Sequence, residues 1–187
     1  MFKVGDKIVY PMHGAGVIQS IEEKAIGDEK QSYYIIKMPG EVKVMVPTAK
    51  AEQIGVRNII DKETAGKVIS VLGQECTEMS MKWNKRYREN VEKMKSGDIY
   101  EVADIVRNLT FKQKDKGLST TEKKMLLNAK QILVSELVLA EDKEKDEVEE
   151  LVEQKINVSY EMHNVVPETT PMEEISSPKV MKKFIQA

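Results

Sequence analysis

The sequence contains few of the residues that disulfide bonding, metal binding and catalysis require. Of its 187 residues one is cysteine, Cys76, and two are histidine, His13 and His163. A single thiol excludes an internal disulfide framework and is typical of a reducing compartment, so we expect a cytoplasmic protein. These three side chains are too few and too widely separated for a His/Cys metal site. We therefore expect no metal and no cofactor.

Long apolar segments are missing as well. The sequence has no run of about 18 apolar residues, the length that a membrane-spanning helix needs. Its first ten residues, MFKVGDKIVY, lack the apolar stretch of a signal peptide. The hydrophobic content of 41% is nevertheless enough for the core of one or two domains. We therefore expect that the protein neither spans nor binds a membrane.

The charge is not that of a protein that binds nucleic acid by bulk charge. The net charge is −2, and residues 141–187 hold 6 Lys and Arg against 12 Asp and Glu. Residues 61–140 hold 15 Lys and Arg against 12 Asp and Glu, with the basic residues densest at 82–95. A nucleic-acid contact in this segment would therefore need a second interaction to bring it to its target.

Two candidate enzyme features are weak. The HGAG sequence at 13–16 suggests a phosphate loop or an oxyanion turn, but no Gly-Lys-Ser/Thr ending and no nucleophile elbow accompany it. A tight turn between strands is the favoured interpretation. Acidic residues beside Cys76 disfavour the thiolate that a catalytic cysteine needs. The sequence therefore predicts a protein that is not an enzyme.

Residues 1–56 are predicted to form a small β module. Four runs rich in β-branched and aromatic residues (DKIVYP, HGAGVIQSIEEKAI, SYYIIKM and GEVKVMVP) alternate with Pro/Gly turns. This spacing indicates a small barrel or a strongly bent sheet. Side chains alternate along the last run. Those predicted to face the core are Val42, Val44 and Val46, and those predicted to face outward are Lys43 and Met45.

Residues 57–156 are predicted to form a helical module. Asp61 and Asp98 are suited to cap helices, and Ser119 with Glu122 forms a capping box for a long helix. Apolar residues recur at helical spacing after that box. Those predicted to face the core are Met125, Leu126, Ala129, Ile132, Leu133, Leu137 and Ala140.

The segment after residue 140 is predicted to continue this helix to about residue 156, and the helical module is predicted to contain four or five helices. Residues 157–187 contain three prolines and little periodicity, so we assign them to a tail. The chain shows no βαβ alternation. The predicted fold class is therefore α+β, a small N-terminal β module followed by a compact all-α module.

The stretch MKWNKRYREN, residues 81–90, holds the only tryptophan, Trp83. Trp83, Tyr87 and Val91 follow one another at intervals of four, which favours a buried face of a helix. If Asn84 instead caps the helix, Trp83 precedes it, and Arg88 at the opposing position offers no apolar partner. The sequence leaves both interpretations open, a core tryptophan and a partly exposed one.

An exposed indole among cations would suit nucleic acid. The surrounding cations neutralise phosphates, while the ring stacks on a base or inserts between two. Stacking on an unpaired base contributes roughly 1–3 kcal/mol, and unstacking a duplex step costs a few kcal/mol. A single tryptophan could therefore hold open a junction that another machine has melted, but could not melt DNA by itself.

Four stretches, in order along residues 2–140, resemble the CarD family (the CarD/CdnL group) of bacterial transcription regulators. They are FKVGDKIVYPMHGAGVI, VMVP, WNKRYRENVEKMKSGD and GLSTTEKKMLLNAKQILVSEL. The resemblance implies a Tudor-like or SH3-like β module that docks on the β subunit of RNA polymerase. It also implies a helical module that contacts promoter DNA with little sequence specificity and stabilises the open promoter complex. The same β fold occurs in the polymerase-docking module of transcription-repair coupling factors.

The resemblance also assigns residues. Trp83 matches the family tryptophan that acts as a wedge at the upstream edge of the melted region. The basic residues expected to contact DNA are Lys82, Lys85, Arg86 and Arg88, with Lys123 and Lys124 as a second contact. The residues expected to contact polymerase are Lys24, Ile26, Lys43 and Met45.

The polymerase-binding positions depart from the family pattern. Family members often have arginine at the positions of both Lys24 and Met45. Lys24 keeps the charge without the planar fork of a guanidinium, and Met45 loses the charge. Lys43 lies two residues from Met45 on the same predicted strand face and is the candidate substitute.

Some alternatives stay open from the sequence. The chain could be a protein-interaction module with Trp83 in its core and no role on DNA. The acidic segment and tail at 141–187 could cover the basic segment, although a solvated tail is favoured. We expect a monomer in function.

Overall fold

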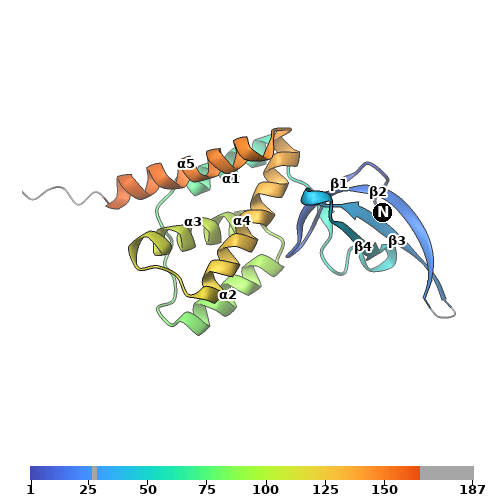
Figure 1. The fold of residues 1–187 in the computed structure, drawn as a ribbon, viewed down its shortest axis with the longest axis horizontal. Helices are drawn as coiled ribbons and strands as arrows, with labels where there is room; N and C mark the ends of the chain where they lie inside the picture. Colours follow the sequence, from blue (N-terminus) through green and yellow to red (C-terminus); the bar gives the residue numbers. More distant parts are fainter. Residues whose placement is uncertain (27–28, 165–187) are drawn as a thin grey trace, which may run out of the picture.

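The computed structural model describes residues 1–26 and 29–164, without the side chains of Ile26, Glu29 and Asn164. A β module and a helical module lie side by side, with the N-terminus in the β module (Figure 1). The helices follow the strands in the sequence instead of alternating with them. The α+β prediction is therefore confirmed.

The β module is a five-stranded antiparallel sheet of the Tudor-like type, with strand order β4-β3-β2-β1-β5. Its strands are β1 (Lys7–Tyr10), β2 (Gly14–Ile26), β3 (Glu29–Lys37), β4 (Lys43–Pro47) and β5 (Arg57–Asn58). The paired strands β2 and β3 extend beyond the rest of the module, away from the helices (Figure 1). A register shift between Ile18 and Ser20 interrupts their ladder near its base.

The alternation predicted for β4 is largely confirmed. Val46 is buried and Val44 packs partly buried against the sheet core, whereas Met45 is 51% exposed. Val42 is an exception because β4 begins only at Lys43, so Val42 precedes the ladder and is exposed. The prediction that Val42 faces the core is wrong.

The sheet ends with a strand that the sequence did not predict. Arg57 and Asn58, which we assigned to the helical module, pair instead with Val9 and Ile8 of β1. The β module therefore reaches two residues further than residue 56. A two-residue strand has no period of its own, so its position depends on the partner strand.

The helical module contains five helices. They are α1 (Lys62–Leu72), α2 (Trp83–Lys95), α3 (Ile99–Asp115), α4 (Thr120–Glu141) and α5 (Lys145–Asn164). The predicted caps are confirmed: Asp61 accepts from Thr64 N at 2.8 Å, and Asp98 caps α3. Ser119 begins α4 with both hydrogen bonds of a capping box.

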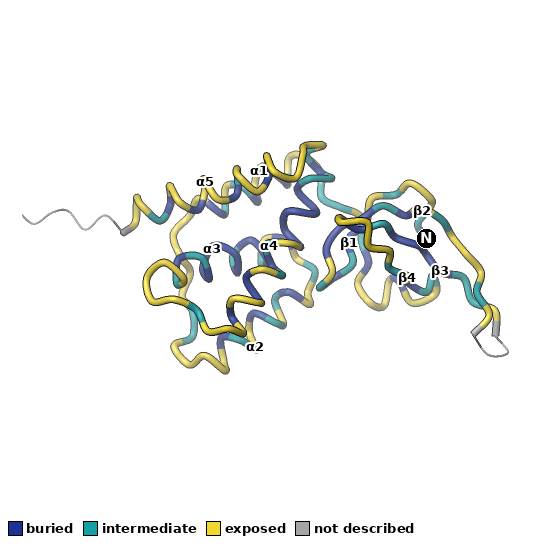
Figure 2. The backbone as a smooth tube through the Cα atoms, viewed as in Figure 1, coloured by how far each residue is buried: buried dark blue, intermediate teal, exposed yellow. Residues whose placement is uncertain are grey.

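Burial is deepest along α3 and α4, at the centre of the module (Figure 2). All seven α4 residues that we predicted to face the core are buried. Helices α1 and α5 pack together and against α3 and α4. The helical core thus forms around the longest helix, whose apolar period was the clearest in the sequence.

The predicted continuation of α4 is wrong. Asp142 adopts a left-handed conformation (φ 57°) and ends α4. The chain then reverses into α5, which packs back against α1 and α4 (Figure 1). Residues 157–164, which we assigned to the tail, form the last two turns of α5. The rest of the predicted tail, residues 165–187, lies outside the described residues.

Candidate functional site

Trp83 lies at the start of α2 and is 56% exposed. The helix begins at Trp83 itself, with Lys82 at the N-cap position, so Asn84 does not cap α2 and that alternative does not hold. Tyr87 and Val91, one and two turns further along, are partly buried against the helical core. The three residues do share one face, but only the later two are covered. The interpretation of Trp83 as a core residue is therefore wrong.

Arg86 departs most from its predicted role, because its side chain is buried instead of facing solvent. Its Nε and Nη2 donate to Glu122 Oε1 at 2.9 and 2.5 Å, and its Nη1 donates to Ser80 O at 2.6 Å. A guanidinium with these partners is not available to a phosphate. We correct its assignment from a DNA contact to the support of the α2 start.

Glu122 joins α2 to α4 through this ion pair. The same carboxylate accepts from Ser119 N and Ser119 Oγ at 3.2 and 3.0 Å. Burial opposes ionisation, but the hydrogen bonds from Arg86 and Ser119 outweigh it and lower the pKa of Glu122. The first turn of α2 is consequently fixed to the first turn of α4.

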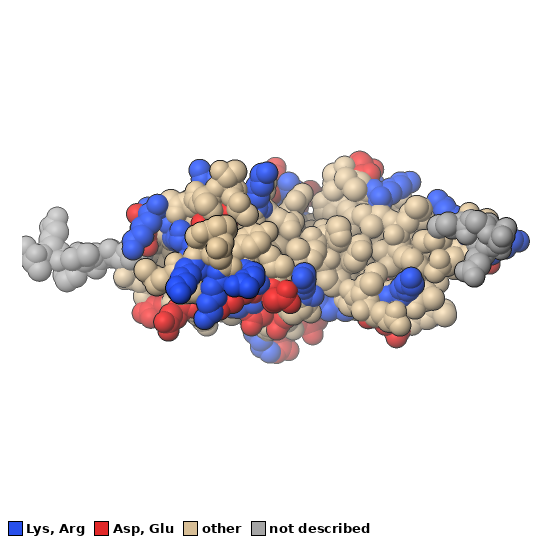
Figure 3. Space-filling view, turned by 90° about the horizontal axis from the view of Figure 1, so that it is seen from below, with Lys and Arg blue, Asp and Glu red and all other residues tan. Residues whose placement is uncertain are grey.

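The other predicted cations remain at the surface. Those exposed around the starts of α2 and α4 are Lys82, Lys85, Arg88, Lys123 and Lys124. The Arg86–Glu122 pair brings the two helix starts together, so these residues from separate parts of the chain share one region. From the α2 side, Lys and Arg side chains gather next to Asp and Glu on the helical module (Figure 3).

The helix end adds to this electropositive region. The α2 start has no acidic residue in its first turn and no side-chain cap. Unsatisfied backbone N–H groups at a helix start carry partial positive charge and attract anions. Among the nearby cations, Lys85 lies 3.7 Å from Glu89, a partial neutralisation at an exposed pair. This arrangement suits a phosphate beside an exposed indole.

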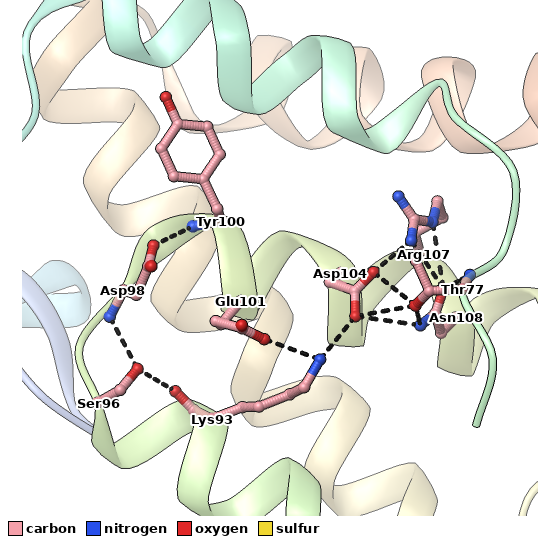
Figure 4. A network of polar contacts seen from close by, with 9 residues as sticks. All are labelled: Thr77, Lys93, Ser96, Asp98, Tyr100, Glu101, Asp104, Arg107 and Asn108. Carbon is pink, nitrogen blue, oxygen red and sulfur yellow. Dashed lines mark hydrogen bonds and ion pairs between the residues drawn. The ribbon is translucent and has the colours of Figure 1, made fainter. Parts of the chain in front are cut away.

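A buried polar network holds the segment that leads into Trp83. Arg107 of α3 is 1% exposed and pairs with Asp104 (Figure 4). It also donates to Val71 O at 2.8 Å. Asn108 donates to Thr77 Oγ1 at 2.6 Å. The network thereby ties the end of α1 and the connection to α2 onto α3.

Lys93 extends the same network to the other end of α2. Its Nζ lies 2.9 Å from Asp104 and 2.7 Å from Glu101, both on α3 (Figure 4). Desolvation opposes the charged form, but hydrogen bonds to these two carboxylates raise the pKa of Lys93. The helix that carries Trp83 is thus braced on α3 as well as on α4.

The outer face of the sheet brings together two predicted polymerase contacts. Lys24 Nζ lies 3.1 Å from Met45 Sδ, across β3. Beneath them on β3, Tyr33 and Ile35 are 7% and 6% exposed, and they alternate with residues of the sheet core. The face therefore has an apolar centre with a cation beside it.

The other two predicted contacts are less closely associated. Lys43 is exposed on the same face of β4 as Met45 and pairs in register with Lys37. Ile26 ends β2, but its side chain lies outside the described part of the chain. Lys24, Lys43 and Met45 therefore share one sheet face.

The HGAG sequence ends the turn between β1 and β2 and forms the first residues of β2, which packs on α4. Gly14 has φ 99°, and a Cβ there would lie 2.6 Å from Ser135 Oγ. Ala15 N donates to the same oxygen at 2.8 Å. The glycine is thus explained by close packing between the modules.

The remaining questions are the reactivity of the Cys76 thiol and the presence of groups that could hold a metal ion. Desolvation raises the pKa of the Cys76 thiol, and Asp104 and Asp115 add to this effect. Acidic groups do contribute, as predicted, but from α3 and not from its sequence neighbours. Within residues 1–26 and 29–164, no group of three His, Cys, Asp or Glu is placed to hold a metal ion. No described helix is long and apolar enough to cross a membrane.

Sequence reasoning missed the buried ions that support these surfaces. Glu136 is fully buried within the apolar run ILVSELVLA, and Arg107 is buried within the apolar face of α3. A charge inside an apolar period is a usable signal, because a buried ion requires a partner. The partner itself, such as Arg57 for Glu136, is 79 residues away and cannot be read from spacing.

Comparison with known proteins is consistent with both modules. Residues 2–60 match the family model of the CarD-like/TRCF RID domain, and residues 67–153 match that of the CarD C-terminal domain. The chain is 43% identical over 138 residues to the putative transcription factor YdeB of Bacillus subtilis (strain 168). This alignment covers 73% of the present chain and 90% of that protein. The chain belongs to the CarD family.

Proposed function

We propose that this protein is a transcription regulator that docks on the β subunit of RNA polymerase and stabilises the open promoter complex. The outer face of the sheet binds the polymerase. The helical module then presents Trp83 to the upstream edge of the melted DNA, where the indole acts as a wedge. The matches to the CarD-like/TRCF RID and CarD C-terminal domains support both parts of this assignment.

The single observation that carries the wedge is the exposure of Trp83. An indole that is 56% exposed at an uncapped helix start can contact a base without any refolding of the helix. Lys85 and Arg88, two and five residues further along α2, are exposed and can contact flanking phosphates, with Lys82, Lys123 and Lys124 around them. Arg86 takes no part in this contact, because Glu122 occupies it.

The free energy available from one stacked indole is enough to stabilise an open complex that the polymerase has already formed. Stacking contributes roughly 1–3 kcal/mol, and 1.4 kcal/mol of preferential binding shifts a two-state balance tenfold. The surface offers phosphate contacts and one stacking ring, which position a protein on DNA without reading its sequence. We therefore propose little sequence specificity, with recruitment supplied by the polymerase.

Replacing the indole tests the wedge. Trp83→Ala should shorten the lifetime of the open complex about tenfold, because about 1.4 kcal/mol of stacking is lost. Polymerase affinity should be unchanged, since Trp83 is not on the outer face of the sheet. Promoter dissociation kinetics measured with a competitor give the lifetime.

Leu127→Ala is the matched control, because Leu127 is an apolar residue of the same module that is 68% exposed. It should leave the open-complex lifetime at the wild-type value. Equal lifetimes for Trp83→Ala and wild type, at saturating protein, would contradict the wedge.

A further inference from the structure

Within the described residues, a single ion pair joins the two modules. Arg57 of β5 donates from Nη1 and Nη2 to the two carboxylate oxygens of Glu136 on α4, at 2.6 and 2.9 Å. Its remaining N–H groups bind Gly97 O (3.0 Å from Nε, 2.8 Å from Nη2) and Asn58 O (2.9 Å). All five donors of the guanidinium are therefore in use. Glu136 is fully buried and also accepts from Ile60 N at 3.0 Å.

Other contacts surround this pair on α4. Ser135 Oγ accepts from Ala15 N of the β1–β2 hairpin, and Lys7 Nζ donates to Leu139 O at 2.9 Å. The close approach at Gly14 leaves no room for a Cβ against Ser135. The β module thus contacts one stretch of α4 through three of its strands: β1, β2 and β5.

Helix α4 also holds α2, the helix that carries Trp83. Glu122 in its first turn binds Arg86 near the start of α2. Glu136 lies fourteen positions later, about 21 Å along α4 at 1.5 Å per residue. Arg57, which Glu136 binds, also holds Gly97 O in the turn that ends α2. Two buried carboxylates on α4 therefore fix the two ends of α2, and one of them also fixes the sheet.

We propose that Arg57 and Glu136 are positioning residues that set the place of Trp83 relative to the polymerase-docking face. The two modules then engage polymerase and DNA as one rigid body instead of as two parts joined by a flexible tether. A rigid body delivers the indole to one position and loses little conformational freedom on binding. This inference rests on the proposed function for its consequence at the promoter, but not for the rigidity itself.

The rigidity is measured first in the free protein. Cys76, the only cysteine, lies in the segment before α2 and is exposed. A second cysteine at Glu23→Cys, exposed on β2, allows a pair of spin labels to report the distance between the modules. The distance distribution should be narrow in the wild-type background. It should broaden in Glu136→Gln and in Arg57→Lys, which loses the planar fork but keeps the charge.

Glu63→Gln is the matched control. It removes a carboxylate from an exposed ion pair with Lys67, made within α1 and not between the modules. Its distance distribution should be as narrow as that of the wild-type background. The comparison separates the loss of this interface from the loss of any ion pair.

The consequence is measured on unlabelled full-length chains. Glu136→Gln and Arg57→Lys should bind polymerase within twofold of wild type, because the outer face of the sheet is intact. Their open-complex lifetimes should fall toward that of Trp83→Ala. Adding Trp83→Ala to either variant should then cause little further loss, since both changes remove the same contact.

For variants that fold, three results would overturn the proposal. They are a distribution that stays narrow in both variants, a broadened distribution with a wild-type lifetime, and a loss of polymerase binding. If Glu136→Gln does not fold, Arg57→Lys decides in the same assays; if neither folds, the pair is a folding contact and the proposal is wrong. A wild-type lifetime for Trp83→Ala would refute the wedge instead, and the label distances would stand independently of it.

Discussion

The outer face of the sheet and the start of α2 expose similar side chains on different supports. Each presents an apolar residue about half exposed beside cations, Met45 in one case and Trp83 in the other. Met45 stands on a strand whose backbone is paired with β3. Trp83 stands on the first residue of a helix without a side-chain cap, held by the buried pair of Arg86 and Glu122. A new charge on the sheet face should therefore change the folding stability little, whereas the stability of the α2 start depends on one ion pair.

The largest effect is expected from a substitution that breaks the Arg86–Glu122 ion pair. Arg86→Ala should lower the free energy of unfolding by about 3 kcal/mol, because it leaves Glu122 buried without its main partner. Arg88→Ala, a change of the same type two residues away at the surface, should shift it by no more than about 0.5 kcal/mol. Urea unfolding followed by circular dichroism measures both. Similar values for the two variants would mean that the pair does not support α2.

A smaller effect is expected on the sheet face. Met45→Asp should weaken polymerase binding about tenfold, roughly 1.4 kcal/mol, because it places a carboxylate over the apolar centre formed with Ile35. The free energy of unfolding should change by no more than about 0.5 kcal/mol, since the side chain is half exposed. Titration of labelled polymerase measures the affinity. Met45→Leu, which keeps an apolar surface, should bind as wild type does, and undiminished binding by Met45→Asp would argue against docking through this face.

The smallest expected effect is a pH dependence of the free energy of unfolding that arises from Glu122, the carboxylate that holds α2 through Arg86. The folded-state pKa of Glu122 is lowered, so its stabilising contribution is complete above the unfolded value of about 4.3. The contribution is lost as the pH falls through the lower folded value. Unfolding free energies between about pH 5 and pH 3 should therefore fall more steeply in wild type than in Glu122→Gln. Equal slopes would show that Glu122 contributes nothing to the acid response.

The sequence located most of the regular structure because it depends on short-range patterns. The caps at Asp61, Asp98 and Ser119 and the seven buried residues of α4 follow from local hydrogen bonding and helical period. The predictions of secondary structure were wrong where the sequence has no regular spacing of apolar residues. The break at Asp142 lies in an acidic stretch that is compatible with a continuous helix, and only the packing of α5 against α1 and α4 favours the reversal.

The candidate site divides in the same way. The density of basic residues around Trp83 and the resemblance of the motifs were visible in the sequence. The sequence could not tell which cations are free, because Arg86 and Arg88 are the same residue type two positions apart. A carboxylate 36 residues away decides between them, since Glu122 binds only the one that faces α4.

By itself, the sequence determined the two-module plan, the helix limits set by caps and glycines, and the family. Tertiary structure decided that Trp83 is exposed, that Arg86 is a support, and that Arg57 and Glu136 hold the modules together. The physical reason is range. Capping and periodicity act over a few residues, whereas a buried ion is tolerated only where the fold brings its partner to it.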